Sequence, residues 1–169
     1  MSQISLGSLQ RITAPILSQL LLAEAAAGKD PSIAIVDVRD DDYIGGHIKS
    51  SLNFPSRTLD ATLPTLVRQL KDKETVVFHC ALSQQRGPGA ALRYLRERER
   101  LAALEKAKEE AKNKAATEGG TEKEDKLVSV EQKVYVLDRG FVGWQEEYGT
   151  DERLTEGYRK ELWADGYWG

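Results

Sequence analysis

Short apolar segments alternate with segments of helical periodicity along most of this chain, and this alternation restricts the fold more than any other feature. Ser32–Val38 and Thr75–Phe78 are apolar almost throughout, as strands covered on both faces are. Lys133–Leu137 is a third such segment. The stretches between them carry apolar residues at helical spacing. This order predicts an α/β domain with a mainly parallel central sheet flanked by helices.

The remaining elements follow from start and stop signals. Thr13 is a candidate N-cap for a helix that runs to about Ala27 and ends at Gly28. We expect the aromatic stretch that begins at Gly149 to pack back onto the domain. The other expected elements are short strands at Leu9–Ile12 and Ser51–Phe54, a short helix from Asp40 to Gly45-Gly46, and helices at Leu59–Leu70, from Gly87 onward and at Phe141–Tyr148.

One segment differs sharply from the rest in charge. Of the 31 residues from Arg96 to Lys126, 18 are charged, nine of each sign. Arg96–Ala116 has opposite charges at helical spacing and no Gly or Pro, which favours a solvated helix. Thr117–Lys126 is typical of a mobile loop. We interpret residues 1–169 as a single domain with a charged helical and loop insertion at about 96–127, either a solvated surface or a partner-binding arm.

Composition excludes several classes of protein. Lys plus Arg number 24 and Asp plus Glu 27, a net charge of −3, which argues against a dedicated nucleic-acid binder. Cys80 is the only cysteine and there are two histidines, so neither an internal disulfide nor a usual structural zinc site is expected. Apolar runs such as Ile16–Leu22 are too short to span a bilayer. We therefore expect no membrane partner and a cytoplasmic, alternatively also nuclear, location.

The residues with the clearest chemistry follow the strand at Thr75–Phe78. Cys80 and Arg86 are separated by five residues, and a helix is expected directly afterwards. Loops at the carboxyl ends of parallel strands bind ligands, and a helix N-terminus favours an anion and a thiolate. Arg86 adds a planar cation suited to a tetrahedral oxyanion. His79 can brace the loop through a backbone hydrogen bond.

This pattern resembles the His-Cys-x5-Arg loop of cysteine-dependent phosphatases. More closely, the chain resembles the rhodanese-fold branch, namely the cell-division-cycle dual-specificity phosphatases and the small fungal phosphatase and arsenate reductase proteins. The segments that carry this resemblance are Asp37-Val-Arg39, Tyr43-Ile-Gly-Gly-His47, Asn53-Phe-Pro55, His79 to Pro88, Val134 to Trp144, and Leu154 to Trp163.

The resemblance implies a rhodanese-like fold and a phosphatase that forms a thiophosphate on Cys80 and needs no metal or organic cofactor. It implies that Arg86 and the loop amides hold the oxyanion of a phosphorylated protein or of a small phosphate or arsenate. His79 and Asp37 would be supporting residues. The phosphate-binding loop is then Ala81, Leu82, Ser83, Gln84, Gln85 and Arg86.

Alternative functions remain open. The same loop can accept arsenate, so an arsenate reductase that uses glutathione and a glutaredoxin is the second hypothesis. Rhodaneses have a loop one residue shorter, sized for sulfur, which makes thiosulfate sulfurtransfer the weaker interpretation. A non-catalytic rhodanese-like interaction module is the remaining alternative.

The chain also departs from the phosphatase pattern. Gly87 stands where many tyrosine phosphatases have Ser or Thr, and the loop contains no acidic residue. No general acid is therefore assigned. Asp37 is a candidate, although bracing Arg86 or the loop amides is its more conservative role. We expect Arg39 to pair with Asp42, and Asp138 and Arg139 can border the pocket.

Overall fold

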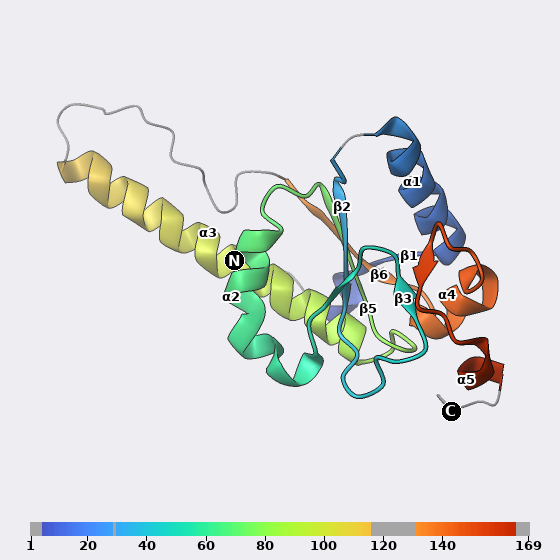
Figure 1. Ribbon diagram of the computed structural model, residues 1–169. Coiled ribbons are helices and arrows are strands. Elements are labelled where there is room, and N and C mark those ends of the chain that lie inside the picture. The colour runs from blue at the N-terminus through green and yellow to red at the C-terminus, as the bar shows by residue number, and fades with distance from the viewer. Residues whose placement is uncertain (1–4, 29, 116–130, 165–169) are drawn as a thin grey trace.

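The computed structural model describes residues 5–28, 30–115 and 131–164. Its centre is a parallel five-stranded sheet in the order β1-β6-β5-β2-β4 (Figure 1). The α/β class with a mainly parallel sheet is confirmed. The strands are β1 (Gln10–Ile12), β2 (Ile33–Asp37), β4 (Leu52–Asn53), β5 (Thr75–His79) and β6 (Lys133–Leu137).

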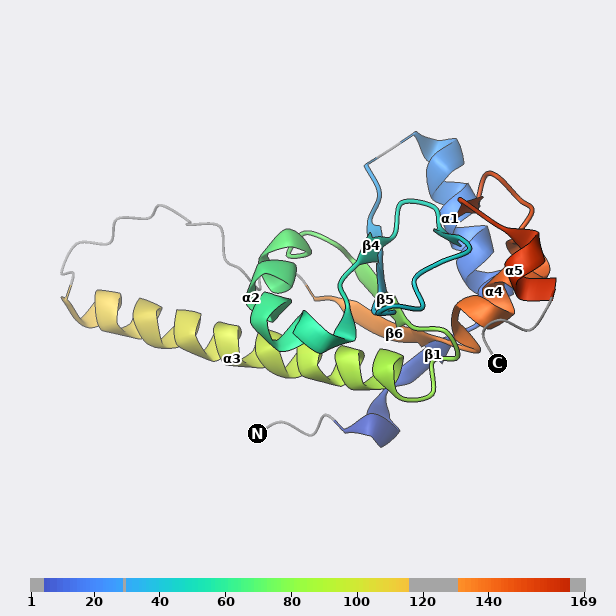
Figure 2. The same cartoon turned by 60° about the horizontal axis from the view of Figure 1, so that its bottom comes forward.

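Helices cover both faces of this sheet (Figures 1 and 2). One face carries α2 and α3, the other α1 and α4, and α5 lies beside α4. The helices are α1 (Ala14–Ala27), α2 (Leu59–Gln69), α3 (Arg86–Ala115), α4 (Gly140–Tyr148) and α5 (Lys160–Ala164), with short 3-10 turns at Leu6–Ser8 and Ser56–Thr58. A small antiparallel pair joins β3 (His47–Ile48) to β7 (Thr155–Glu156).

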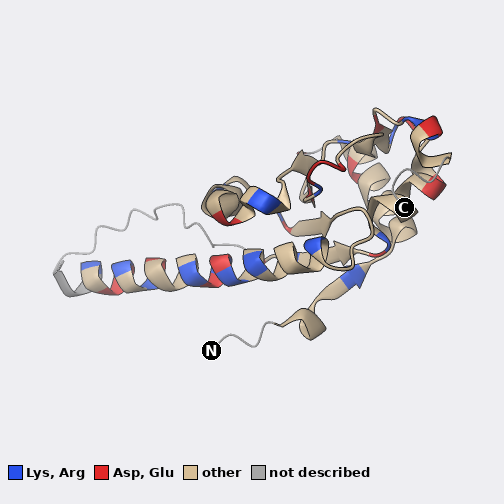
Figure 3. Cartoon of the chain, turned by 90° about the horizontal axis from the view of Figure 1, so that it is seen from below, with Lys and Arg blue, Asp and Glu red and all other residues tan. Residues whose placement is uncertain are grey.

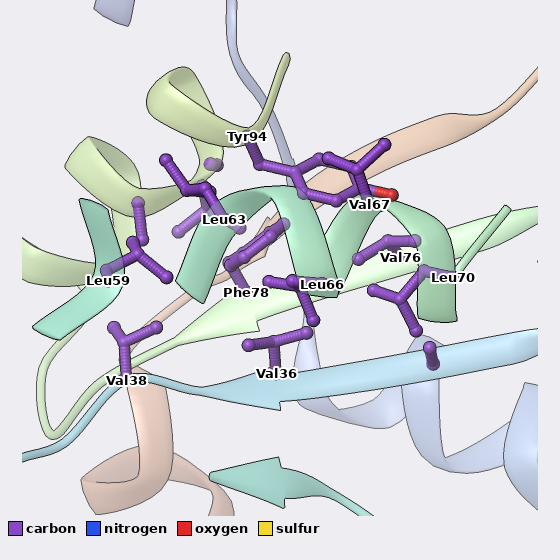
Figure 4. Close-up of a cluster of buried hydrophobic side chains, with 14 of the residues drawn as sticks. Val36, Val38, Leu59, Leu63, Leu66, Val67, Leu70, Val76, Phe78 and Tyr94 are labelled. Atoms are coloured by element: carbon purple, nitrogen blue, oxygen red, sulfur yellow. The ribbon is translucent and has the colours of Figure 1, made fainter. Parts of the chain in front are cut away.

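Side chains along β5 alternate between two cores. Val76 and Phe78 point to the α2 and α3 side, where Leu66 and Tyr94 are buried with them (Figure 4). Val77 points to the other side and joins the cluster of α1 and α4. Because both faces are covered, a nearly continuous apolar strand is the sequence pattern that this position requires.

Capping residues and glycines in the sequence correctly predict where most of the helices and strands begin and end. The Thr13 side chain accepts a hydrogen bond from the Ile16 N–H, and α1 ends at Gly28 with φ 65°. The short helix expected from Asp40 to Gly45-Gly46 is wrong, because this segment is a turn. Gly45 and Gly46 have φ values of 78° and 123°, outside the helical range.

The described part of the C-terminal stretch packs on the domain as expected. Trp163 Nε1 donates to the Gly45 carbonyl at 2.9 Å, and the Tyr158 hydroxyl donates to Gln145 Oε1 at 2.6 Å. Tyr167 and Trp168 lie outside the described residues.

The charged insertion divides at residue 115. Its first part continues α3 to Ala115, whereas residues 116–130, and with them the loop expected at Thr117–Lys126, lie outside the described residues. Among the described helices, none is long and apolar enough to cross a membrane.

Candidate active site

The loop between β5 and α3 curls around the sulfur of Cys80. Cys80 follows the last residue of β5 and is 3% exposed. The Ser83 N–H donates to Cys80 Sγ at 3.2 Å, and Ser83 has φ 55°. This left-handed residue turns the chain so that Arg86 begins α3. The nucleophile candidate and the helix N-terminus therefore share one small loop, in which a backbone amide points at the sulfur.

The start of α4 holds the first residues of this loop. The Phe141 N–H donates to the Cys80 carbonyl at 3.0 Å, and the Val142 N–H donates to the Ala81 carbonyl at 2.9 Å. Gly140 has φ 56°, and a Cβ there would lie 2.5 Å from the Ala81 carbonyl oxygen. Only glycine allows this approach, so α4 fixes which way the loop carbonyls point.

A second glycine sits at the other end of the loop. A Cβ on Gly87 would lie 3.3 Å from His79 Cα and 3.4 Å from the Cys80 nitrogen. The first turn of α3 thus packs tightly on the end of β5. This close approach gives a physical reason for glycine at the position after Arg86.

Arg86 does not stand free at the loop mouth. Its guanidinium donates to both carboxylate oxygens of Asp42, at 2.7 and 2.5 Å, and lies 3.4 Å from Asp40 Oδ2. The hydrogen bonds with Asp42 raise the pKa of Arg86 above its ordinary value and lower that of Asp42. The Asp42 carboxylate therefore binds the same guanidinium that an oxyanion in the loop would bind.

Asp40 is the more buried of the two aspartates, with a side chain 11% exposed. Burial acts to raise the pKa of Asp40, but hydrogen bonds from the Ser56 hydroxyl and the Arg57 N–H, with that from Arg86, lower it overall. Both aspartates are thus carboxylates at neutral pH. Neither is placed as a proton donor in this state.

The expected pairing of Arg39 with Asp42 is wrong. Arg39 is fully buried and donates instead to both oxygens of Asp37, at 2.6 Å for the shortest contact. Arg39 lies two residues after Asp37, the last residue of β2, and its backbone N–H also donates to Asp37 Oδ1 at 3.0 Å. Asp37 is consequently not a brace for Arg86, and its carboxylate belongs to this buried pair.

His79 joins the buried pair to the loop. Its Nε2 lies 3.7 Å from Asp37 Oδ2, and its Nδ1 lies 3.1 Å from the Cys80 carbonyl oxygen. Burial lowers the pKa of His79, so the ring is neutral at pH 7. A neutral ring with its proton on Nδ1 donates to Cys80, which is the backbone hydrogen bond expected of His79.

Arg11 is a site residue that the sequence pattern did not indicate. From β1 its guanidinium donates to the Ser83 carbonyl at 3.1 Å and to Asp138 at 3.4 Å. Arg139 turns away and pairs with Glu146. Only the strand order could have indicated these neighbours of the loop. Asp40 and Asp42 follow β2, and Arg11 belongs to β1. Because the strands are parallel, all three lie near the carboxyl ends of the strands, as Cys80 does.

The outer loop residues differ in exposure. Leu82, Gln84 and Gln85 are exposed, Ala81 is half-buried, and Ser83 is fully buried. Among the described residues, no group of three His, Cys, Asp or Glu side chains could hold a metal ion.

The chain is thus a parallel α/β domain in which the loop from Cys80 to Arg86 follows the central strand. The profile of the family described as Rhodanese-like domain matches residues 20–147. The chain therefore belongs to the rhodanese-like domain family.

Relatives within this family bear two kinds of name. Dual specificity phosphatase Cdc25 of Arabidopsis thaliana is 39% identical over 119 residues, covering 68% of this chain and 63% of the plant protein. The match thus spans less than two thirds of that relative. Arsenate reductase 2.1 of Oryza sativa subsp. japonica is 36% identical over 140 residues, covering 82% of this chain and 71% of the rice protein.

A solved structure extends the likeness to nearly the whole chain. The crystal structure of Saccharomyces cerevisiae Ygr203w, described as a homolog of single-domain rhodanese and Cdc25 phosphatase catalytic domain, has a TM-score of 0.68 and 29% identity. It covers 96% of this chain and 97% of the yeast chain. The resemblance to rhodanese-fold phosphatases and arsenate reductases is confirmed.

Proposed function

We propose that this chain is a cysteine-dependent phosphatase that hydrolyses phosphate monoesters through a thiophosphate on Cys80. The observation that carries the proposal is the loop itself: five residues separate Cys80 from Arg86, and the Ser83 amide already points at Sγ. A loop of this length encloses a tetrahedral oxyanion at the N-terminus of α3.

Each loop residue then has a defined task. The Cys80 thiolate attacks phosphorus, the bond from phosphorus to the ester oxygen breaks, and its electrons leave with that oxygen. The backbone amides from Ala81 to Arg86 and the Arg86 guanidinium bind the other phosphoryl oxygens. Water next attacks phosphorus, which releases phosphate and restores the Cys80 thiolate.

In this mechanism, the phosphate of the substrate replaces Asp42 as the anion bound to Arg86. Arg86 must give up part of its contact with Asp42 to reach a phosphoryl oxygen. Because Asp42 and Asp40 are ionised, they do not protonate the departing oxygen in the substrate-free state. Phenolic esters, including phosphotyrosine in proteins, leave without full protonation and are the substrates that this loop suits best.

Two variants test the mechanism on an aryl phosphate. Cys80→Ser should abolish turnover, because a hydroxyl is a poor nucleophile at neutral pH, while the loop amides still bind phosphate. Arg86→Ala should lower both kcat and kcat/KM, roughly a hundredfold or more in the latter. Arg93→Ala is the matched control, since Arg93 lies on α3 and pairs with Asp60 on the exposed surface. Appreciable turnover by pure Cys80→Ser protein would exclude the mechanism.

Arsenate reduction is the second candidate function, and the likeness to rice Arsenate reductase 2.1 favours it. Cys80 would attack arsenate in the same loop. Cys80 is the only cysteine in the chain, so the reducing electrons must come from an external thiol, for which we propose glutathione with a glutaredoxin. Aryl phosphate hydrolysis and glutathione-dependent arsenate reduction, measured on one preparation, distinguish the two functions.

A further inference from the structure

Carboxylates outnumber guanidiniums in the ion pairs at the candidate active-site loop. Arg86 binds Asp42 through both carboxylate oxygens and lies 3.4 Å from Asp40. Arg11, which contacts the same loop from β1, pairs with Asp138. Two cations thus meet three carboxylates, so this group of side chains is formally negative before a substrate binds. Because like charges repel, a phosphate dianion by itself gains little long-range attraction from these side chains.

Bound phosphate affects Asp42 more than Asp40. In the proposed mechanism, phosphate takes the Arg86 guanidinium from Asp42, whose side chain is 39% exposed. Asp40 stays bound by the Ser56 hydroxyl and the Arg57 N–H. Asp42 retains the backbone N–H of Asp40 at 3.0 Å but loses its cation. A partly solvated carboxylate then lies beside a phosphate dianion, and the two repel each other.

A cation carried by the substrate compensates for this loss. In an extended peptide, residues two apart lie on the same face, about 7 Å from each other. A lysine or arginine within two residues of a phosphotyrosine can therefore reach a carboxylate beside the phosphate. Asp42 is accessible for such a contact, and Asp41, which is 86% exposed, extends the acidic surface. A glutamate at the same place in the peptide adds repulsion instead.

We propose that Asp42 is a specificity-determining residue that selects phosphotyrosine segments with a lysine or arginine within two residues of the phosphotyrosine. This inference rests on the proposed phosphatase function and names the class of its substrate. Asp42 exchanges one cation for another, with Arg86 as its partner in the free protein and the basic residue of the substrate as its partner in the complex. Selection thus combines attraction of basic segments with repulsion of acidic ones.

Three phosphotyrosine peptides test this selection, identical except that the residues flanking phosphotyrosine are lysine, glutamine or glutamate. In wild-type protein, kcat/KM should fall in that order, with about fivefold or more between the lysine and glutamate peptides. In Asp42→Asn this ratio should shrink to about twofold, because the glutamate peptide gains more than the lysine peptide. The wild-type ratio should also decrease as the salt concentration rises, since both side chains are partly solvated.

Asp60→Asn is the matched control. Asp60 lies on α2, is 81% exposed and pairs with Arg93, so its replacement removes one negative charge without a contact to Arg86. It should keep the wild-type ratio between the lysine and glutamate peptides. Hydrolysis of p-nitrophenyl phosphate, which has no flanking residues, checks that the loop is intact in each variant.

The outcomes separate this inference from the proposed function. Equal kcat/KM values for the three peptides, or a lysine preference that Asp42→Asn leaves unchanged, would overturn the role of Asp42, while turnover of p-nitrophenyl phosphate would still support a phosphatase. If wild-type protein hydrolyses neither p-nitrophenyl phosphate nor any of the peptides, the phosphatase function itself fails, and the selection by Asp42 fails with it.

Discussion

The Arg86 guanidinium is paired with the carboxylate of Asp42 in this structure. Asp42 binds it through both carboxylate oxygens, and the two side chains are 34% and 39% exposed. The pair is thus partly solvated, and its free energy is modest compared with a buried pair. In the proposed mechanism, such a carboxylate competes with phosphate for the same donors and adds a negative charge beside the bound phosphate.

Asp42→Asn should therefore tighten oxyanion binding, by about two- to fivefold. Phosphate affinity can be measured as protection of Cys80 from alkylation by iodoacetamide. Because the hydrogen bonds from Arg86 lower the pKa of Asp42 below its ordinary value, Asp42 stays ionised at neutral and mildly acidic pH. The gain should persist over this range and disappear only when the pH falls through the lowered pKa of Asp42.

Asp41→Asn provides the matched control for this variant. Asp41 belongs to the same acidic run but is 86% exposed and pairs with Arg57. It changes the net charge equally without a contact to Arg86. Weaker phosphate binding by Asp42→Asn would instead make Asp42 a residue that positions Arg86 for the substrate.

At the scale of elements, the loop depends on three secondary structures that meet around it. Cys80 directly follows β5, α3 begins with Arg86, and the N-terminus of α4 binds the carbonyls of Cys80 and Ala81. With these carbonyls held by α4, the loop amides are free to face the sulfur. The geometry of the site is therefore set partly by an element that contributes no side chain to the chemistry.

Gly140→Ala tests this dependence. The new methyl group would lie 2.5 Å from the Ala81 carbonyl oxygen and 2.6 Å from that of Cys80, so the loop must shift. We expect unfolding free energy to fall by about 1–3 kcal/mol and kcat/KM to fall by at least tenfold.

Gly28→Ala is the appropriate comparison. Gly28 has φ 65°, yet a Cβ there would meet nothing within 4 Å. It should lose stability through backbone strain alone and retain kcat/KM. Equal kcat/KM values in Gly140→Ala and wild-type protein would show that the α4 contact does not shape the loop.

At the scale of the whole molecule, helix α3 extends well beyond the sheet on which it packs. α3 has 30 residues and is about 45 Å long. Its first half packs on the sheet through Ala90, Tyr94 and Leu101, and the remainder extends beyond the sheet and α2 (Figures 1 and 2). Charges of both signs lie along this extension (Figure 3). The packed part ends near Leu101, which is 8% exposed, whereas Leu104 is 46% exposed.

Replacement of residues 106–126 by a short Gly/Ser linker should leave stability and aryl phosphatase activity within about twofold of wild type, since long surface segments cost little to close. A longer replacement that begins at Arg100 removes Leu101 from the core and should lower unfolding free energy by about 1–3 kcal/mol. Urea unfolding and kcat/KM on both variants check this. Loss of small-substrate turnover in the shorter replacement would make the extension part of the catalytic domain.

Local signals predict much of this fold. The ends of α1 at Thr13 and Gly28 and the position of β5 follow from neighbouring residues, and the spacing of Cys80 and Arg86 places both on one loop. Partnerships between distant residues do not follow in this way. Asp42 contacts Arg86 across 44 positions because β2 and β5 are neighbours, and nearness in sequence suggested Arg39 instead.

Two further details depend on tertiary context. The turn after β2 contains Asp40 as a plausible cap, yet the Asp40 carboxylate accepts from the Ser56 hydroxyl and the Arg57 N–H instead of capping a helix. Ser83 adopts φ 55° although its residue type does not favour it, because contacts from Arg11 and to Cys80 determine the backbone.

The position of β5 in the sheet makes the attachment point of Cys80 rigid. β5 is hydrogen-bonded to β2 over all five of its residues and to β6 over four. Central strands of this kind are the last to exchange their amide hydrogens with solvent, since their exposure requires global unfolding. The loop after Cys80 has no strand neighbours, and single hydrogen bonds from α4 and Arg11 hold its carbonyls. The candidate nucleophile is thus attached to the part of the molecule that we expect to exchange its amide hydrogens most slowly, whereas the loop that follows it is held by a few single hydrogen bonds.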